Sequence, residues 1–252
     1  MERAEYETMA RLEDEHWWFG GKRAVARSLL SGVLVRPPAR TLDVGCGTGG
    51  TTAALSDRFG PALGCELNPY AVRQAAARIP GRVFRGRAES LPIRSGSIDL
   101  VTGLDVLYHR EVDESRALSE WRRVLAPGGT LYISDSALPC LEGPHDRAVH
   151  ARERYTARSL ADRVRRAGFD VVKVTYWNFF LFPIAAAFRL GRRVGGQNPR
   201  SDLTGLPPVF VNRFLAFLLL AESSWLRRFR FPIGTSVALV ARKPDRSEEW
   251  AG

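Results

Sequence analysis

The chain has 252 residues, of which 45% are hydrophobic and 25% are charged. That length can bury one substantial core, and the composition excludes a fibre, a solenoid and a disordered chain. The formal net charge of +10 comes mostly from arginines scattered along the chain, which favours a solvated basic surface over a nucleic-acid groove; an acidic group on a substrate stays open.

The amino-terminal region, residues 1–34, predicts a helical cap. Its two helices, Arg3–Glu15 and Lys22–Leu30, are joined by Trp17-Trp18-Phe19 and by a break at Gly20-Gly21. Glycine is costly inside a helix because it loses the most backbone freedom on folding. We therefore expect two short helices with an aromatic connection ahead of the core.

From Arg40 onward, short β-rich runs alternate with helical patterns, which predicts an α/β fold with a mostly parallel sheet and helices on both faces. The expected strands are Thr41–Val44, Ala62–Glu66, Arg82–Arg85, Ile98–Gly103 and Thr130–Ser134. The expected helices are Thr51–Phe59, Pro69–Arg78 and Asp113–Leu125, the last one closed by Pro127-Gly128-Gly129.

The carboxy-terminal part predicts a helix, two strands and an insertion. The helix is Thr156–Ala167, and the strands are Asp170–Tyr176 and Thr235–Ala241. Between these strands lies an apolar stretch, residues 179–231, which we expect to form two helices of a lid or substrate wall because a sheet does not need it. The prediction is thus one domain over 1–252, with its core in residues 35–178 and 232–244.

Cysteine usage and the length of the apolar runs predict a cytoplasmic location. Cys46, Cys65 and Cys140 are odd in number and lack Cys-x-x-Cys spacing, so they indicate neither a disulfide framework nor a zinc site. The amino-terminal segment is charged and amphipathic, unlike a signal peptide. The apolar runs Tyr176–Phe188 and Val209–Ala221 are shorter than the roughly 20 residues that span a bilayer, so we expect no transmembrane segment.

A glycine-rich turn follows the first predicted strand, in the run Leu42–Gly50. Glycines let a ligand approach the backbone, and the helix start behind them offers unpaired N–H groups. The glycine spacing fits the dinucleotide pattern, with Glu66 about 20 residues on as a ribose acceptor. Asp43 favours another ligand, because a carboxylate suits an ammonium group such as that of S-adenosylmethionine and not a pyrophosphate; the chain also lacks a Tyr-x-x-x-Lys pair.

This turn is one of several motifs between Arg40 and Asp135, the others being Gly64–Pro69, Ala88–Ile93, Ile98–Val101, Leu104–His109 and Leu125–Gly129. Together, and in this order, they resemble class I methyltransferases of the type 11 group. The resemblance implies a Rossmann-like, seven-stranded sheet whose final strand is antiparallel. It also implies S-adenosylmethionine as cofactor over the first two strands, S-adenosylhomocysteine as product, and substrate over the fourth and fifth strands.

The same resemblance implies a role for each matched residue. The methionine part of the cofactor would be held by Asp43 and by the backbone of Gly45, Cys46 and Gly47, and closed in on its other side by Leu104 and Asp105. The ribose would bind to Glu66. Adenine would pack with its face on Leu67 and with its polar edge against Ala88 and Glu89. Relatives often have aspartate at the position of Arg87, so Glu89 or main chain must accept from the adenine amino group here. A second departure is Tyr108, where relatives often have glutamate.

The segment Glu15–Phe19 with Arg23 resembles the amino-terminal cap of a subset of these methyltransferases. There the cap covers the cofactor, with an aromatic face against the sulfonium or substrate and an arginine near the carboxylate. Cation–π attraction makes Trp18 the candidate for contact with the sulfonium. The alternative is that the two tryptophans only fasten the first helices to the core.

A general base is needed only if the nucleophile must lose a proton, since positive sulfur already activates the methyl group. Candidates are His109, at the end of the fourth strand, and His145, His150 and Tyr155 in the loop after the fifth. His109 alternatively bonds a loop carbonyl. His150 and Arg154 could share a helix face that presents a base and an anion-binding group; alternatively they lie in an exposed loop. His145-Asp146 offers too few ligands for a metal, so none is expected.

The insertion is richer in apolar side chains than a water-facing lid requires, notably at Tyr176–Phe182 and Val209–Trp225. We expect it to line a hydrophobic pocket, with a homodimer interface, contact with a membrane surface and plain core packing as alternatives. The predicted function is methylation of an O, N or C atom on a hydrophobic small molecule, in natural product biosynthesis or lipid metabolism. Alternatives are a non-methylating cyclase or isomerase and a non-catalytic cofactor-binding regulator. Nucleic-acid methylation is disfavoured, since the chain lacks an Asn/Asp-Pro-Pro-Tyr/Phe motif.

Overall fold

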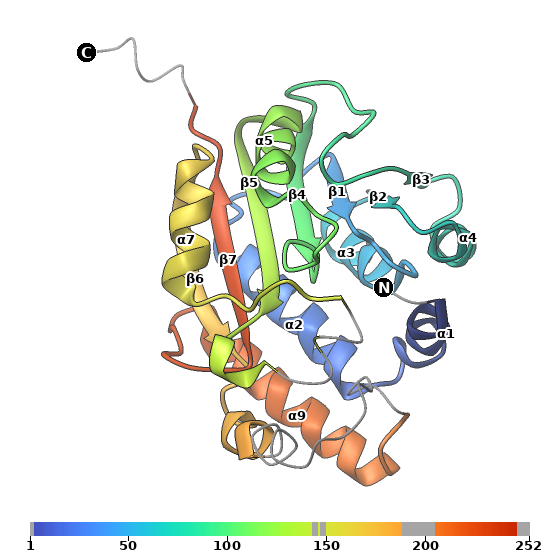
Figure 1. Ribbon diagram of the computed structural model, residues 1–252, viewed down its shortest axis with the longest axis vertical. Coiled ribbons are helices and arrows are strands. Elements are labelled where there is room, and N and C mark those ends of the chain that lie inside the picture. The colour runs from blue at the N-terminus through green and yellow to red at the C-terminus, as the bar shows by residue number, and fades with distance from the viewer. Residues whose placement is uncertain (1–2, 143–145, 147–149, 188–204, 246–252) are drawn as a thin grey trace.

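The computed structural model describes residues 3–142, 146, 150–187 and 205–245. Its centre is one seven-stranded sheet in the order β3-β2-β1-β4-β5-β7-β6 (Figure 1). The strands are β1 Thr41–Val44, β2 Ala62–Glu66, β3 Val83–Arg85, β4 Ile98–Leu104, β5 Leu125–Ser136, β6 Asp170–Trp177 and β7 Ser236–Arg242. β7 pairs antiparallel with β5 and β6, and the other pairs are parallel. The predicted fold class is confirmed, and the reversed last strand separates it from the parallel dinucleotide-binding sheet.

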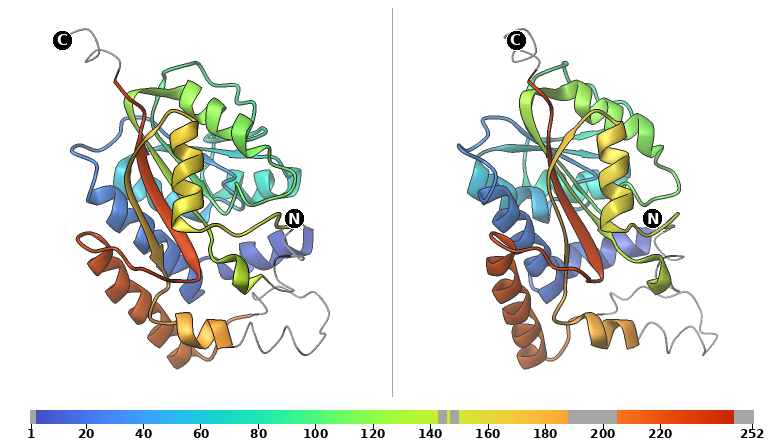
Figure 2. Two further views of the ribbon diagram at one scale, coloured as in Figure 1. Left: turned by 60° about the vertical axis from the view of Figure 1, so that its left-hand side comes forward. Right: turned by 90° about the vertical axis from the view of Figure 1, so that its left-hand side faces the viewer.

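Helices cover both faces of the sheet, as predicted (Figure 2). They are α1 Arg3–Leu12, α2 Trp17–Ser31, α3 Gly50–Phe59, α4 Pro69–Arg78, α5 Glu114–Val124, α7 Ala157–Arg166 and α9 Val209–Leu226, with the 3-10 helix η1 at Pro139–Leu141. α5 and α7 pack on one face, where Trp121 and Leu160 are buried. α2, α3 and α9 pack on the other, where Leu29, Leu55 and Leu219 are buried.

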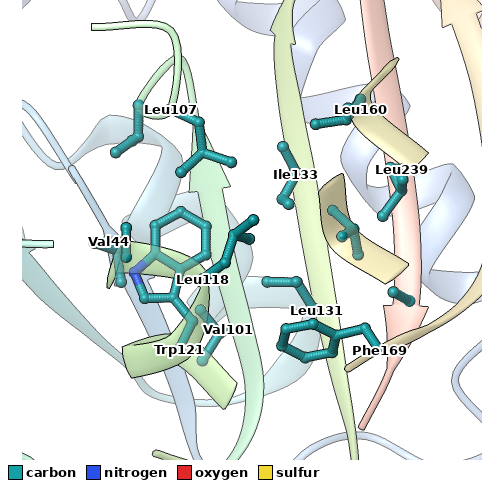
Figure 3. Packing of buried hydrophobic residues seen from close by; sticks show 14 of the residues in the cluster. Val44, Val101, Leu107, Leu118, Trp121, Leu131, Ile133, Leu160, Phe169 and Leu239 are labelled. Carbon is teal, nitrogen blue, oxygen red and sulfur yellow. The ribbon is translucent and has the colours of Figure 1, made fainter. Parts of the chain in front are cut away.

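Alternation along the strands supplies both hydrophobic cores, because successive strand side chains point to opposite faces. Leu131 and Ile133 of β5 belong to the core under α5 and α7, whereas Tyr132 between them joins the core under α2 and α9. Figure 3 shows Trp121 of α5 close to Val101 in the first of these cores. The sheet is therefore anchored from both sides, which holds its carboxyl edge in place for a site.

Local sequence signals set several helix starts. Asn68 caps α4 by accepting from Tyr70 N at 2.9 Å, and Pro69 occupies the first turn. Thr156 and Ser159 form a reciprocal capping box at the start of α7. Because these signals act within a few residues, the predicted starts of both helices agree with the structure to within about one residue.

β5 starts earlier than predicted. It begins at Leu125, directly after α5, so Pro127-Gly128-Gly129 lies inside the strand instead of closing the helix. Pairing with β4 shifts its register between Ile98 and Leu100, and Gly128 has a φ of 72°. A glycine irregularity of this kind lets a strand bend without ending.

The predicted helix break at Gly20-Gly21 is wrong. α2 begins at Trp17, after the N-cap His16, and runs through both glycines. The reason for glycine at position 21 lies in tertiary packing, since a Cβ there would lie 2.1 Å from Leu219 Cδ1 of α9. Gly21 therefore lets α2 and α9 approach each other closely.

The insertion contains the predicted helix at Val209, which continues to Leu226 as α9. Residues 182–187 form a first short helix, and residues 188–204 lie outside the described residues. Within the described part of the chain, α9 is the one helix whose length and composition would suffice to cross a membrane, because the helix continues beyond the apolar run that ends at Ala221. One side of α9 nevertheless packs on α2, with Leu219 and Leu226 fully buried.

Candidate active site

A cavity of about 440 Å³ lies at the carboxyl ends of β1, β2 and β4, between α1 and the first turns of α2. Ligands of doubly wound sheets bind at this edge, where the strand order reverses. Eleven of the twelve predicted cofactor residues line it, namely Trp18, Asp43, Gly45, Cys46, Gly47, Glu66, Leu67, Ala88, Glu89, Leu104 and Asp105, and Arg23 does not. Of the candidate bases, His109 and His150 line the cavity, Tyr155 does not, and His145 lies outside the described residues.

The glycine-rich turn is tied to β2. Gly45 and Gly47 have left-handed φ values of 71° and 56°, which other residues rarely adopt. The N–H groups of Gly45 and Cys46 donate to Cys65 O at 2.8 and 3.0 Å. Gly47 N donates to Glu66 Oε2 at 3.0 Å. The turn therefore exposes a bare backbone edge to the cavity, while its amides hold its own shape.

Asp43 is buried at the cavity wall. Its Oδ1 accepts from Thr102 Oγ1 of β4 and its Oδ2 from Thr52 Oγ1 of α3, each at 2.6 Å. Burial raises the pKa of Asp43, and the two hydroxyl groups and the charge of Lys22 act against that rise. Carboxylate oxygens can accept more than one hydrogen bond, so Asp43 keeps capacity for a ligand ammonium while it joins β1 to its neighbours.

Glu66 presents a fixed carboxylate at the end of β2. Its Oε1 accepts from Asn68 N at 2.8 Å and from the Tyr6 hydroxyl at 3.2 Å, and its Oε2 accepts from Gly47 N. The next residue, Leu67, is 39% exposed and lines the same cavity. A held carboxylate beside an apolar side chain can accept from a diol and cover a flat ring.

The residues expected at the adenine edge are tied into neighbouring loops. Glu89 Oε1 accepts from Asp113 N at 3.0 Å and from Arg87 Nη2 at 3.4 Å. Ala88 O accepts from Trp121 Nε1 at 3.1 Å. Arg87, which stands where relatives often have aspartate, thus pairs with the carboxylate expected to replace that aspartate.

Of the two neighbouring cations of α2, Lys22 lines the cavity and Arg23 does not, so the expectation for Arg23 is wrong. Lys22 is buried, and its Nζ pairs with Asp105 Oδ2 at 2.8 Å. Arg23 Nη1 instead donates to Glu13 O at 2.8 Å. Because α2 is continuous and each residue turns by about 100°, Lys22 lies on the same face as Trp18, four positions earlier.

Trp18 has two roles in the structure. Its ring stacks on Trp177 of β6, with centroids 4.8 Å apart and planes inclined by 24°. Trp177 is buried and its Nε1 donates to Ser134 Oγ at 3.1 Å. Trp18 also lines the cavity. It therefore fastens α2 to the sheet and gives the cavity an aromatic surface, so the two interpretations of the aromatic cluster are not exclusive.

His109 and His150 line the cavity from two different loops. The His109 ring stacks on Tyr108, with centroids 4.5 Å apart, and its backbone bridges to Ala151. The helix expected to carry His150 and Arg154 is wrong, since His150 has a φ of 56° and the residues after it form isolated bridges. Pairing with the loop after β4 replaces local helix formation, and both side chains still reach the cavity.

Tyr155 lies outside the cavity, which corrects its assignment as a candidate base. Its ring is fully buried, and its hydroxyl donates to Glu114 Oε2 at 2.7 Å. Burial raises the pKa of Tyr155 well above its ordinary value. Arg152 and Arg163 pair with the same Glu114 oxygen at 2.9 and 2.6 Å. Tyr155 thus belongs to a polar network between α5 and α7.

The roof of the cavity comes from α1 and the turn after it, which lie in the predicted cap but before the aromatic segment that carries its resemblance. The Tyr6 hydroxyl reaches Glu66, as described above. Glu13 Oε1 accepts from Thr48 Oγ1 at 2.5 Å, and its Oε2 accepts from Gly50 N at 3.1 Å. Glu13 therefore places a carboxylate at the positive end of α3 and fastens the cap to the glycine turn. The helical pattern predicted α1, but nothing local indicates which loop it covers.

Two buried polar atoms at the cavity wall have no hydrogen-bond partner among the described residues. They are Asn178 Oδ1 and Arg154 Nε. The same side chains are otherwise held, since Asn178 Nδ2 donates to Thr235 Oγ1 at 2.7 Å and Arg154 Nη2 pairs with Asp146 at 2.8 Å. Unpaired buried polar atoms are costly, so these two indicate a polar ligand group. No motif marks Asn178, which follows the edge strand β6.

Comparison with known proteins identifies the family to which the glycine turn and its neighbouring strands belong. Residues 42–133 match the family model described as a methyltransferase domain. The chain is 32% identical over 168 residues to a malonyl-[acyl-carrier protein] O-methyltransferase of Methylococcus capsulatus, which covers 61% of this chain and 60% of that protein. The chain thus spans less than two thirds of that relative. Residues 42–133 are therefore identified as a class I methyltransferase domain of the type 11 group, a family that uses S-adenosylmethionine.

Solved structures agree with this assignment at the level of the fold. A Haloferax volcanii methyltransferase in complex with the Trm112 methyltransferase activator has a TM-score of 0.61 at 20% identity, over 96% of this chain and 93% of that one. A SAM-dependent methyltransferase of Thermotoga maritima has a TM-score of 0.57 at 21% identity, over 94% and 99%. Identities this low establish a common fold and no more.

Proposed function

We propose that this chain is an S-adenosylmethionine-dependent methyltransferase that methylates an O, N or C atom of a hydrophobic small molecule carrying a polar or anionic group. The observation that carries the proposal is the presence of the Glu66 carboxylate and the Lys22 ammonium in one cavity around the glycine turn. We further propose that residues 1–252 act as one domain, in the cytoplasm and in natural product or lipid metabolism.

The residues at the cavity fit the cofactor. Glu66 offers carboxylate oxygens to ribose hydroxyl groups, and Leu67 offers apolar surface to adenine. Lys22 supplies a cation for the amino-acid carboxylate, and Trp18 an aromatic face for positive sulfur. Gly47 lets the ligand come close to the backbone, because no side chain intervenes.

When bound, the cofactor supplies a methyl carbon that positive sulfur has activated for in-line displacement. The chain's own residues then act by positioning and by excluding water. Glu13 and Tyr6 hold the roof closed over the glycine turn, and Trp18 forms the side wall. His109 and His150, at the acceptor end, are the candidates to take a proton from an oxygen or nitrogen nucleophile.

The polar group of the acceptor is proposed to meet Asn178 and Arg154. Each has one unpaired buried atom at the cavity wall, and leaving such an atom without a partner costs about 1–3 kcal/mol. An acceptor that donates to Asn178 Oδ1 or accepts from Arg154 Nε would recover that cost. The Methylococcus relative is an O-methyltransferase by name, which supports testing oxygen acceptors first.

Titration and a product assay test the proposal together. The protein, with Asp43→Ala and Glu66→Ala variants, is titrated with S-adenosylmethionine, S-adenosylhomocysteine and NAD, then supplied with lipophilic acids and phenols. We expect both sulfur compounds to bind, more weakly in both variants, and S-adenosylhomocysteine to accumulate with an acceptor. Binding of NAD alone would overturn the proposal. A rearranged acceptor with unconsumed cofactor would indicate a cyclase or isomerase, and binding without turnover a regulator.

A further inference from the structure

One side of α9 exposes a stripe of large apolar side chains. The stripe consists of Phe210, Phe214, Phe217 and Trp225, which are 77%, 58%, 63% and 58% exposed. Since successive helical residues turn by about 100°, this spacing places all four on one side of the helix. The opposite side carries Leu219 and Leu226, which are buried in the core against α2. The stripe is therefore apolar surface in excess of what the core uses.

Helix α9 is fixed to the protein by polar contacts, so it presents the stripe without leaving the fold. Glu222, fully buried, accepts from the main-chain N–H groups of Phe179 and Phe180 at 2.8 and 3.2 Å. Lys173 Nζ donates to the main-chain carbonyl of Arg227 at 3.3 Å, just beyond the helix. Crossing a bilayer would leave these groups unpaired in hydrocarbon. The helix is therefore better suited to lie against the surface of a bilayer, where these hydrogen bonds stay intact, than to cross it.

The exposed charges carried by α9 and by the turn after it are all positive. Between residues 205 and 232 they are Arg213, Arg227, Arg228 and Arg230, and the acidic residue in this range, Glu222, is buried. Aromatic side chains accompanied by arginines are typical of helices that lie in the interface of an anionic membrane. A second copy of this chain would bring arginine against arginine, which disfavours self-association through this side.

We infer that the stripe docks on the surface of a membrane that contains anionic lipid, with the aromatic rings at headgroup level. The first turn of α9 lies close to the cavity, because Asn212 accepts from Trp17 N at 2.9 Å and Trp17 lines the cavity. Figure 2 shows α9 on the outside of the molecule, beyond α2. This docking does not depend on the proposed function. If the chain is the proposed methyltransferase, docking would also give a lipophilic acceptor a short path from the bilayer to the cavity.

Vesicle flotation tests the docking. The full chain is mixed with phosphatidylcholine vesicles, with or without phosphatidylglycerol, at low and at physiological salt. We expect flotation with the anionic vesicles that weakens as salt rises. The triple variant Phe210→Ser/Phe214→Ser/Phe217→Ser should bind at least about tenfold more weakly, since it loses interfacial apolar area. The triple variant Arg227→Ser/Arg228→Ser/Arg230→Ser should bind roughly a hundredfold more weakly at low salt.

The matched control replaces Arg158, Arg165 and Arg166 of α7 with serine, which removes the same charge from the opposite face of the sheet. Equal weakening by both arginine triples would mean diffuse charge attraction and would overturn the inference, as would the absence of flotation. A dimer in light scattering that the phenylalanine variant dissociates would identify a second copy as the occupant instead. S-adenosylhomocysteine titration serves as a separate readout: no binding even by the wild type would count against the proposed function alone.

Discussion

Lys22→Met removes an ammonium that lines the cavity together with the glycine turn, and keeps an apolar stem of similar length. In the structure that ammonium pairs with Asp105 at 2.8 Å within the cavity wall. The proposed role of Lys22 is to bind the amino-acid carboxylate that S-adenosylmethionine and S-adenosylhomocysteine share. The variant should therefore weaken the binding of both compounds.

The magnitude follows from burial and charge. Lys22 is 7% exposed, so its interaction with a carboxylate is only weakly screened by solvent. A hydrogen bond to a charged group contributes about 1.5–3 kcal/mol, which corresponds to roughly 10- to 150-fold in affinity. The variant also leaves Asp105 without its partner, so a negative charge would face the ligand carboxylate. Lys22→Met/Asp105→Asn removes that repulsion and should recover part of the loss.

Calorimetric titration with S-adenosylhomocysteine measures this effect without a known acceptor. The matched control is Arg23→Met, which removes the next cation along the same helix. Arg23 does not line the cavity, and its side chain donates to Glu13 O instead. Its affinity should stay within about threefold of the wild type, or under about 0.7 kcal/mol. If Arg23→Met weakened binding as much as Lys22→Met, the assignment of Lys22 would be refuted. Thermal unfolding of both variants separates loss of binding from loss of fold.

Three further predictions concern the ribose carboxylate, the N-cap of α2 and the anchor of α9. Glu66→Gln, which can turn a donor toward Gly47 N, should lower S-adenosylhomocysteine affinity about tenfold or more in the same titration. Burial lowers the pKa of His16, so as the pH falls below about 6.5 the imidazole is protonated more readily in the unfolded chain than in the folded one, and the free energy of unfolding decreases. His16→Asn keeps an N-cap acceptor and should flatten this dependence on pH in urea unfolding. Glu222→Ala leaves buried main-chain N–H groups without an acceptor and should lower the free energy of unfolding by about 3 kcal/mol, against less than about 0.5 kcal/mol for the exposed control Ser224→Ala.

Each of these three has an outcome that contradicts it. Wild-type affinity in Glu66→Gln would remove the carboxylate from the ribose site. An equal pH slope in His16→Asn and wild type would show that another group titrates in this range. A change below about 1 kcal/mol in Glu222→Ala would mean that water replaces the carboxylate, so that α9 is less firmly anchored than the contacts indicate.

Local signals in the sequence were sufficient to predict the bounds of several strands and helices. β1, β2 and α4 have the predicted bounds, because alternation, glycine turns and the Asn68-Pro69 start act within a few residues. Those signals did not predict the order of the strands, which only the structure shows, or the reversal of β7. The reversal was expected from the family resemblance of the motifs, and the antiparallel pairing of β7 with β5 and β6 agrees with it.

The candidate site was predictable where its residues belong to those motifs. The glycine turn and Glu66 follow strands directly, and parallel strands bring their carboxyl ends to one edge, so their convergence needs no further information. Asn178 and Tyr6 could not be recognised in the same way. Each reaches the cavity from an element without a motif, and each is identified only by what it contacts across the fold.

By itself, the sequence determined the α/β class, the glycine turn and the carboxylate that follows the second strand, since these depend on neighbours along the chain. Only the tertiary structure decided that Lys22 and not Arg23 lines the cavity, that Gly21 is a packing residue and that Tyr155 is buried. The physical reason is that the direction of a helical side chain depends on where its helix begins and what it packs against. For α2 both are set with α9, whose Asn212 holds Trp17 from 195 residues away.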